Sequence, residues 1–244
     1  MILRILSAVL LTILASAASA QTPSNSKIKV LILTGGHGFQ AEPFFQMFKD
    51  NPDITWVTTA HEKTAEGYDR DDLYTFNVVV LYDAQVNITE AQQARFLALF
   101  DKGIGVVILH HAYLSYPMWA EYGRIAGGKY IYREEQRAQG FASSHYRGDV
   151  DIPVTVAAKD HPVTAGLQDF LLKDELYTEM YMLDNITPLL KTGDELLAWT
   201  RIEKKSRIAG TILGHGPTAF QNPNFRRFLA QSIRWVAQGQ SSGN

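Results

Sequence analysis

The stretch KIKVLILTGGHGF, residues 27–39, decides the fold that the rest of the chain must fit. It begins with a run of Val, Ile and Leu that is typical of a buried strand, and then turns through closely spaced glycines. The following residues, 42–49, place phenylalanines at helical spacing, at positions 44, 45 and 48. A strand, a glycine-rich turn and a helix in succession predict one β-loop-α unit.

Further strands continue this pattern in the first half of the chain. ITWVTTA (54–60), FNVVVLYD (76–83) and the run around VVIL (106–109) are predicted strands, and Thr89 is the predicted N-cap of a helix that ends at Gly103. The near-continuous apolar runs indicate strands that are buried on both faces, as in a parallel sheet. The sequence therefore predicts an α/β fold, a doubly wound and mostly parallel sheet covered by helices on both faces.

The second half of the chain is less regular. A polar segment rich in aromatic and charged residues is expected to form a long functional loop, and no internal repeat or domain linker interrupts the chain. A single domain is therefore expected over residues 27–240. Its expected parts here are a short helix within 116–128, the loop at 129–150, strands at 151–157, 195–202 and 206–215, and a closing amphipathic helix at 224–239.

The first 20 residues have the features of a cleavable secretory signal. Arg4 precedes an apolar run from Ile5 to Ala15, and a small-residue ending closes the segment at Ala20. A membrane-spanning helix is the alternative, but the run is shorter than the roughly 18 apolar residues that a span requires. We therefore expect cleavage near Ala20, a flexible leader at 21–26, and a secreted or periplasmic protein with no membrane partner in its mature form.

Composition excludes several classes of function. A formal net charge of -2 gives no basic surface for a nucleic acid or an anionic membrane. The chain has no cysteine, which rules out disulfides and a thiolate nucleophile. Any catalysis must then rest on His, carboxylate or Tyr side chains, or on a metal. Composition does not decide between a monomer and an oligomer.

Histidines follow three of the predicted strands. His37 follows the first strand, His110 and His111 follow 106–109, and His215 follows a late strand. Asp83 ends another strand, and ligands of open parallel sheets bind outside the carboxyl ends of strands. Successive side chains of a strand point to opposite sides, so only one of His110 and His111 is expected to enter the site unless the chain turns sharply there. His110 is favoured as the residue that enters the site, and the imidazole of His111 is then expected to bond to the backbone. For each histidine taken singly, the alternative is a purely structural role.

Two later segments complete the candidate set. In DELYTEMY (174–181), Glu175 near His215 would orient an imidazole or complete a metal shell, and an exposed strand is the alternative. His145 is the candidate from the polar segment, and Tyr113, Tyr116, Trp119 and Tyr130 offer faces on which a sugar can stack. The candidate catalytic residues are His110, His111, His215 and Glu175; the candidate substrate contacts are Gly36, His37, Phe39, Asp83, Tyr113, His145 and Tyr177; and the candidate ligands of a divalent metal such as zinc are His37, His110 and His215.

Several motifs, in this order, resemble the ThuA-like (trehalose utilisation) family over nearly the whole mature chain. They are LILTGGHGF, GIGVVILHHA, DHPVTAGLQDF followed by DELY, and RIAGTILGHGPTAFQNPNFRRFLAQSIRWVAQG. The resemblance implies the class I glutamine amidotransferase-like fold, a flavodoxin-like three-layer α/β/α sandwich. In that superfamily the turn after the fourth strand carries a Cys, where this chain has LHHA, and His215 corresponds to the superfamily's catalytic His. Relatives are associated with the breakdown of disaccharides through 3-keto sugar intermediates.

The function expected from residues and resemblance together is that of an exported enzyme of carbohydrate catabolism. It would act on a keto-glycoside or a disaccharide-derived sugar by His-assisted acid/base chemistry, with or without a metal. Two alternatives stay open: a non-catalytic carbohydrate-binding or accessory protein on the same fold, and a metal-dependent amidohydrolase.

Overall fold

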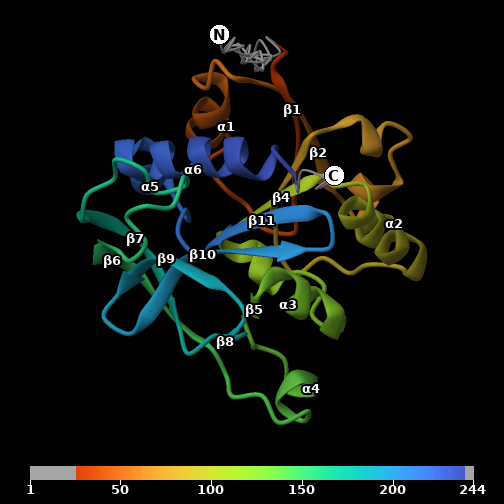
Figure 1. Cartoon of the computed structure of the whole chain (residues 1–244). Helices are drawn as coiled ribbons and strands as arrows, with labels where there is room; N and C mark the ends of the chain where they lie inside the picture. Colours follow the sequence, from red (N-terminus) through yellow and green to blue (C-terminus); the bar gives the residue numbers. More distant parts are fainter. Residues whose placement is uncertain (1–25, 240–244) are drawn as a thin grey trace, which may run out of the picture.

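A computed structural model describes residues 26–239 of the chain (Figure 1). The predicted signal segment, the cleavage position near Ala20 and nearly all of the predicted leader lie outside the described residues. Within residues 26–239, none of the helices is long and apolar enough to cross a membrane.

A nine-stranded sheet with the order β2-β1-β3-β4-β11-β10-β9-β6-β7 forms the centre of the molecule. Its first five strands are parallel, in the order of a flavodoxin-like sheet, and its last four are antiparallel. The parallel strands are β1 (Ile28–Gly35), β2 (Ile54–His61), β3 (Val78–Asp83), β4 (Gly105–Leu109) and β11 (Ser206–Thr211). The antiparallel strands are β10 (Glu195–Glu203), β9 (Thr187–Thr192), β6 (His145–Val156) and β7 (Phe170–Thr178), and β5 (Gly128–Lys129) pairs separately with β8 (Tyr181–Met182).

Helices cover both faces of the parallel strands, which makes the fold a three-layer α/β/α sandwich (Figure 1). The crossover from β1 to β2 and the crossover from β3 to β4 run to opposite sides of β1, so right-handed connections place their helices on opposite faces. One layer holds α1 (Ala41–Lys49), α5 (Pro217–Gln221) and α6 (Pro223–Val236), and the other holds α2 (Glu90–Asp101) and α3 (Ala120–Ala126). A short helix, α4 (Glu134–Arg137), lies away from both layers, and 3-10 turns lie at Glu66–Asp69, Leu73–Thr75 and His110–Leu114.

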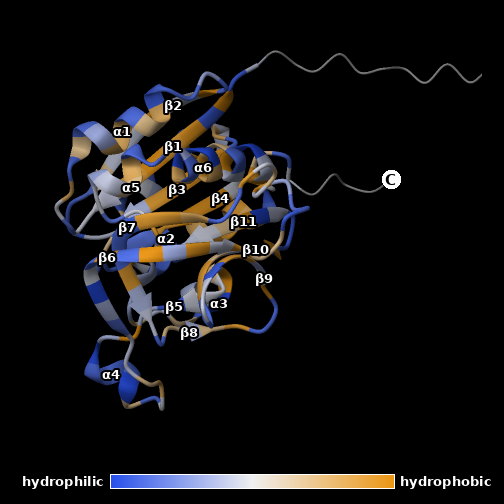
Figure 2. Ribbon diagram, turned by 90° about the vertical axis from the view of Figure 1, so that its left-hand side faces the viewer, coloured by the Kyte–Doolittle hydropathy of each residue, from blue (hydrophilic) through white to orange (hydrophobic). Residues whose placement is uncertain are grey.

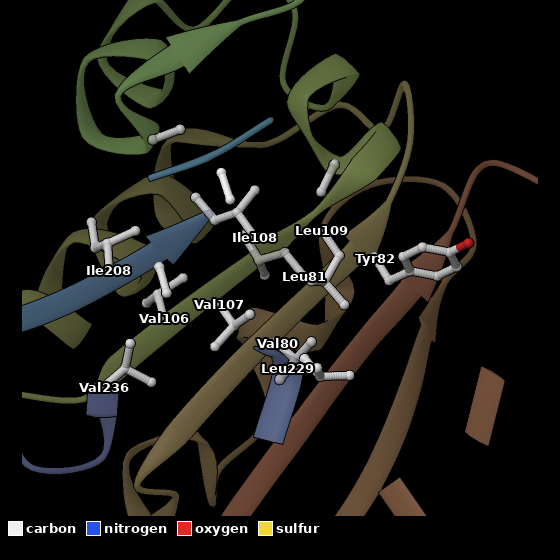
Figure 3. Packing of buried hydrophobic residues seen from close by; sticks show 14 of the residues in the cluster. Val80, Leu81, Tyr82, Val106, Val107, Ile108, Leu109, Ile208, Leu229 and Val236 are labelled. Atoms are coloured by element: carbon white, nitrogen blue, oxygen red, sulfur yellow. The ribbon is translucent and has the colours of Figure 1, made fainter. Parts of the chain in front are cut away.

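Local signals and burial explain these elements. Thr89 caps α2 as predicted, because its hydroxyl accepts from the Gln92 amide in a complete capping box. Every residue of β3 and β4 is buried, and Figure 2 shows the central strands as hydrophobic. Val80 and Val107 share one buried cluster with Leu229 of α6 (Figure 3). Each such buried side chain contributes about 1.5–3 kcal/mol to stability.

The structure differs from the sequence-based expectation in the second half of the chain. The segment 129–150 was expected to be one loop, but β6 begins at His145, six residues before the predicted strand at 151. Residues 145–151 alternate little in hydropathy because this end of β6 is exposed, so its period-2 signal is weak. The antiparallel extension formed by β10, β9, β6 and β7 places β7 beside the loop after β11, where it reaches the carboxyl edge of the parallel strands.

Candidate active site

Four imidazoles converge at the carboxyl ends of the parallel strands. The ring centroids of His37 and His111 lie 4.9 Å apart, and those of His110 and His215 lie 5.1 Å apart. The ring centroids of His37 and His215 are 6.0 Å apart, which closes the group. These residues follow β1, β4 and β11, so the topology of the sheet brings together side chains that are up to 178 positions apart in the sequence.

His110 occupies a sharp turn at the end of β4. Its φ of +46° lies in the left-handed region that a non-glycine residue adopts at a cost of about 1–3 kcal/mol. The imidazole is fully buried, and its Nδ1 lies 2.5 Å from the Ile212 carbonyl oxygen. A carbonyl only accepts, so Nδ1 carries a proton, and Nε2 lies 3.0 Å from the Tyr177 hydroxyl and 3.4 Å from Glu175 Oε1.

His111 is held in the same way on the next residue. Its Nδ1 lies 3.1 Å from the Asp83 carbonyl oxygen, and its buried Nε2 has no hydrogen-bond partner. Burial, followed by the nearby His110, lowers the pKa of His111 to about 2, so this imidazole is neutral at physiological pH. Both imidazoles bond to backbone carbonyls, and of the two it is His111 that lines the pocket described below, while the favoured position, His110, is fully buried beneath it.

β7 supplies the acidic and phenolic groups. Glu175 and Tyr177 are two residues apart and therefore lie on one face of the strand, facing His110. Burial opposes ionisation of Glu175, but its hydrogen bond to His110 and the nearby imidazole charges outweigh it and hold the pKa of Glu175 below its ordinary value. Burial raises the pKa of Tyr177 well above its ordinary value, so the phenol stays protonated and donates.

Asp174 fixes the loop that carries His215. Its carboxylate accepts from the Gly214 amide at 2.6 Å and from the His215 amide at 3.0 Å. The half-buried imidazole of His215 has a lowered pKa, because burial and then the nearby His110 disfavour its charged form. The backbone of His215 is thus positioned by β7, the same strand that carries Glu175.

A pocket of about 340 Å³ opens between these elements. Four of its eleven lining residues are tyrosines, and the ring centroids of Tyr130 and Tyr177 lie 4.7 Å apart. Buried His110 lies beneath the lining residues, next to Glu175 and Tyr177. The lining residues are His37, Ala84, Gln85, His111, Leu114, Tyr130, Tyr132, Tyr146, Glu175, Tyr177 and His215.

A larger hollow of about 520 Å³ lies beside α1 and α5, but it lacks comparable chemistry. No imidazole lines it, and Arg226, its one cation, is paired with Asp50 at 2.7 Å. The smaller, histidine-lined pocket is therefore the candidate site.

Three predicted substrate contacts near the first strands lie outside this pocket. The Asp83 carboxylate is buried and faces His61, whose Nε2 lies 3.9 Å from Asp83 Oδ2, so only the Asp83 carbonyl supports the site. Gly36 has a φ of +73°, and a Cβ there would lie 1.8 Å from the Ala84 carbonyl oxygen, so its role is the close approach of two loops. Phe39 packs on Phe44 and Tyr82, with ring centroids 5.1 and 5.2 Å away.

Other predicted contacts are also placed elsewhere. Tyr113 is a fully buried core residue whose ring centroid lies 5.0 Å from that of Trp199. Tyr116 and Trp119 pack around Tyr122 and do not line the pocket. The His145 side chain is 62% exposed, and its Nε2 lies 3.8 Å from Glu179 Oε2.

Sequence reasoning missed Tyr132, Tyr146 and Gln85 as lining residues. Tyr146 follows His145 on β6 and therefore points to the opposite side of the strand. Without the pairing register of β6, the sequence does not show which of these two side chains faces the pocket. Gln85 has a φ of +56°, a turn conformation that no residue type in its neighbourhood announces. Tyr132 lies in the irregular segment between β5 and α4.

Comparison with known proteins agrees with this architecture. The family model described as trehalose utilisation (ThuA) matches residues 29–236. A ThuA-like protein from Parabacteroides merdae is 23% identical with a TM-score of 0.73, and the match covers 90% of this chain and 93% of that chain. One from Bacteroides uniformis is 21% identical with a TM-score of 0.67, covering 91% of this chain and 98% of that chain.

A cytoplasmic protein from Salmonella typhimurium is 11% identical with a TM-score of 0.61, and the match covers 86% of this chain and 99% of that chain. At these identities the solved structures show a common fold alone. No curated protein gives a significant match.

Proposed function

This chain belongs to the ThuA family, and from that premise we propose that it is an exported enzyme that acts on a small carbohydrate in the histidine-lined pocket. Family membership points to a role in trehalose utilisation.

The pocket suits one or two sugar rings. Its volume of about 340 Å³ is within the range of small-molecule sites. Tyr130, Tyr132 and Tyr146 form aromatic walls against which the apolar face of a sugar ring can stack. The imidazoles, Glu175 and the Tyr177 hydroxyl supply the donors and acceptors that sugar hydroxyls require.

The chemistry we propose is proton transfer on a keto-sugar, such as a 3-keto derivative of a disaccharide. A carbonyl group acidifies the neighbouring C–H, so a base on one side and a polarising group at the carbonyl oxygen promote elimination or isomerisation. His37 is exposed at the pocket and takes the role of base, while the neutral His111 Nε2 accepts from a substrate hydroxyl. The floor formed by His110, Glu175 and His215 faces the carbonyl.

The observation that carries this proposal is the convergence of His37, His111 and His215 on one tyrosine-walled pocket. Its test is turnover of oxidised and unoxidised disaccharides by the wild-type protein and by the His37→Gln and His111→Gln variants, followed by product analysis. General acid/base groups contribute about 10²–10⁴-fold, so we expect His37→Gln to lower kcat by at least about 100-fold. His145→Gln, an exposed histidine outside the pocket, is the matched control and should leave kcat unchanged.

Unchanged turnover in both pocket variants would refute the acid/base assignment. Sugar binding without any product after long incubation would instead support the alternative of an accessory binding protein. The low pKa of His111, which makes it an acceptor rather than a base, is the observation that favours this alternative.

The proposal of export is tested separately. The N-terminal sequence of the protein recovered from an expressing bacterium should begin near Gln21, and the protein should fractionate outside the cytoplasm. An intact Met1 on cytoplasmic protein would remove this part of the proposal.

A further inference from the structure

The floor of the pocket holds three ligand atoms of the kinds that bind transition metals. One nitrogen each from His110 and His215 and one Glu175 oxygen all lie within 4.8 Å of one another. They come from the turn after β4, from the loop after β11 and from β7. In residues 26–239 this is the group that brings three such atoms together, and Glu175 takes the place that was predicted for His37.

His110 is preorganised as a ligand. Its Nδ1–H donates to the Ile212 carbonyl, which fixes the tautomer and directs the Nε2 lone pair into the group. This bond from the second ring nitrogen to a carbonyl is the support that metal-binding histidines have in known sites. Complete burial and the bond to the Ile212 carbonyl hold the ring in this orientation.

The ligand atoms of His110 and Glu175 lie next to each other at the floor. Nε2 of His110 is 3.4 Å from Glu175 Oε1 and 3.0 Å from the Tyr177 hydroxyl. A cation between the nitrogen and the carboxylate oxygen would be bound by lone pairs of both.

The side chains around the floor offer no lysine or arginine as a partner for Glu175. No Lys or Arg is among the residues that line the pocket. A third imidazole, His111, is 3% exposed, and its Nε2 is buried without a hydrogen-bond partner beside the same pocket. Imidazoles gathered around one carboxylate form a donor set for a dication.

We propose that His110, Glu175 and His215 bind one divalent transition-metal ion, Zn²⁺ by ligand type, at the floor of the pocket. This inference rests on the proposed function, since the metal would polarise the keto oxygen of the sugar. Two imidazoles and one carboxylate form a known type of catalytic zinc site, which keeps a position open for water or substrate. Because Zn²⁺ bonds to nitrogen and oxygen at about 2.0–2.2 Å, the ligand atoms must draw together, and the half-buried Glu175 and His215 side chains are free to do so.

The test measures metal binding directly. The purified full chain is stripped with a chelator, dialysed, and titrated with Zn²⁺ by calorimetry, with metal content checked by elemental analysis. We expect one Zn²⁺ per chain, and a loss of affinity of at least about 100-fold in Glu175→Gln and in His215→Gln. The control is the double variant His145→Gln, Glu179→Gln, which removes an exposed His–Glu pair from the same protein and should bind Zn²⁺ as the wild type does.

Two results would overturn the proposal: a wild-type protein that binds no Zn²⁺, or variants that bind it with wild-type affinity. Circular dichroism of both variants shows whether each is folded. X-ray absorption at the zinc edge needs no variant, and for the wild type it should report two imidazoles and one carboxylate as ligands. Failure here is distinct from failure of the proposed function. Turnover by metal-free protein that is still lost in His37→Gln keeps the acid/base function without the metal, whereas Zn²⁺ binding without sugar turnover keeps the metal alone.

Discussion

Glu66 shows how one side chain stabilises a turn next to the parallel sheet. Its carboxylate accepts from the Glu62 amide at 3.0 Å and from the Lys63 and Thr64 amides at 2.9 Å each. Desolvation opposes its ionisation, but these backbone hydrogen bonds outweigh it and lower the pKa of Glu66 to about 2 from an ordinary value of 4.5. The turn that follows β2 thus depends on a charged carboxylate.

The stabilising effect of Glu66 should depend on pH. A carboxyl group whose pKa is lower in the folded protein stabilises the fold above its unfolded pKa, and this effect disappears as pH falls through the folded pKa. We therefore expect Glu66→Gln to lower the free energy of unfolding at pH 7, with a difference from wild type that shrinks between pH 4.5 and pH 2. Urea unfolding at a series of pH values measures this difference.

Glu62→Gln is the matched control, because Glu62 contributes its backbone amide and not its side chain to this turn. A difference between Glu66→Gln and wild type that is constant with pH would mean that the charge of Glu66 is irrelevant to the turn.

At the scale of elements, β7 joins two parts of the candidate site. Glu175 and Tyr177 face the imidazoles, and the preceding residue, Asp174, binds two amides of the loop after β11. One strand therefore both supplies side chains to the pocket and sets the position of His215.

Replacing Asp174 by Asn should loosen this connection. Asn has one acceptor oxygen and would turn its amide N–H groups toward a backbone N–H, which leaves a buried donor without a partner at a cost of about 1–3 kcal/mol. We expect Asp174→Asn to lower the free energy of unfolding by that amount and to weaken Zn²⁺ binding through a displaced His215. Denaturant unfolding and calorimetry measure the two effects.

Asp149→Asn serves as the control for Asp174→Asn, since the Asp149 side chain is 82% exposed and is paired with Lys173. A fully stable Asp174→Asn protein with wild-type Zn²⁺ affinity would show that other contacts hold the loop.

For the molecule as a whole, the sheet consists of a parallel core and an antiparallel extension. Strands of the core are joined by longer ladders than the ladder that joins the β6 and β7 hairpin to the rest of the sheet. β1 pairs with β3 over six residue pairs, whereas β6 joins β9 through two, Thr155 with Lys191 and Val156 with Leu190. The hairpin of β6 and β7, which carries Tyr146 and Glu175, is therefore bound to the rest of the sheet by a short ladder.

We expect this hairpin to open more readily than the core. Backbone amides in β7 should exchange with solvent at least about tenfold faster than those of β3 and β4. The reason is that segments joined to the rest of a protein by few hydrogen bonds open locally more often. Hydrogen exchange followed by mass spectrometry resolves these peptides. Equal protection in β7 and β3 would show that the extension and the core unfold as one unit.

The parallel core could be predicted from sequence because its strands are continuous apolar runs such as Val78–Leu81, and the helix cap at Thr89 has a local signal. The family match confirms the resemblance seen in the motifs. The extension was harder to predict, since the exposed end of β6 at His145 lacks a clear alternation and β9 was not recognised.

The same division applies to the candidate site. Strand ends located His37, His110, His111 and His215, because the carboxyl edge of a parallel sheet follows from the order of its elements. The direction of a side chain does not follow from that order, and so Asp83 was placed in the pocket although its carboxylate faces His61. The roles assigned to the pocket residues stay predictions.

Two of the three residues at the floor of the pocket, His110 and His215, follow strands of the parallel core, whereas Glu175 stands on β7 and Tyr146 on β6 of the antiparallel extension. Selectivity can therefore be altered on β6 alone. Redesigning the exposed end of β6 around Tyr146, while β7 and the core are left untouched, is the direct way to retarget the protein to a different sugar.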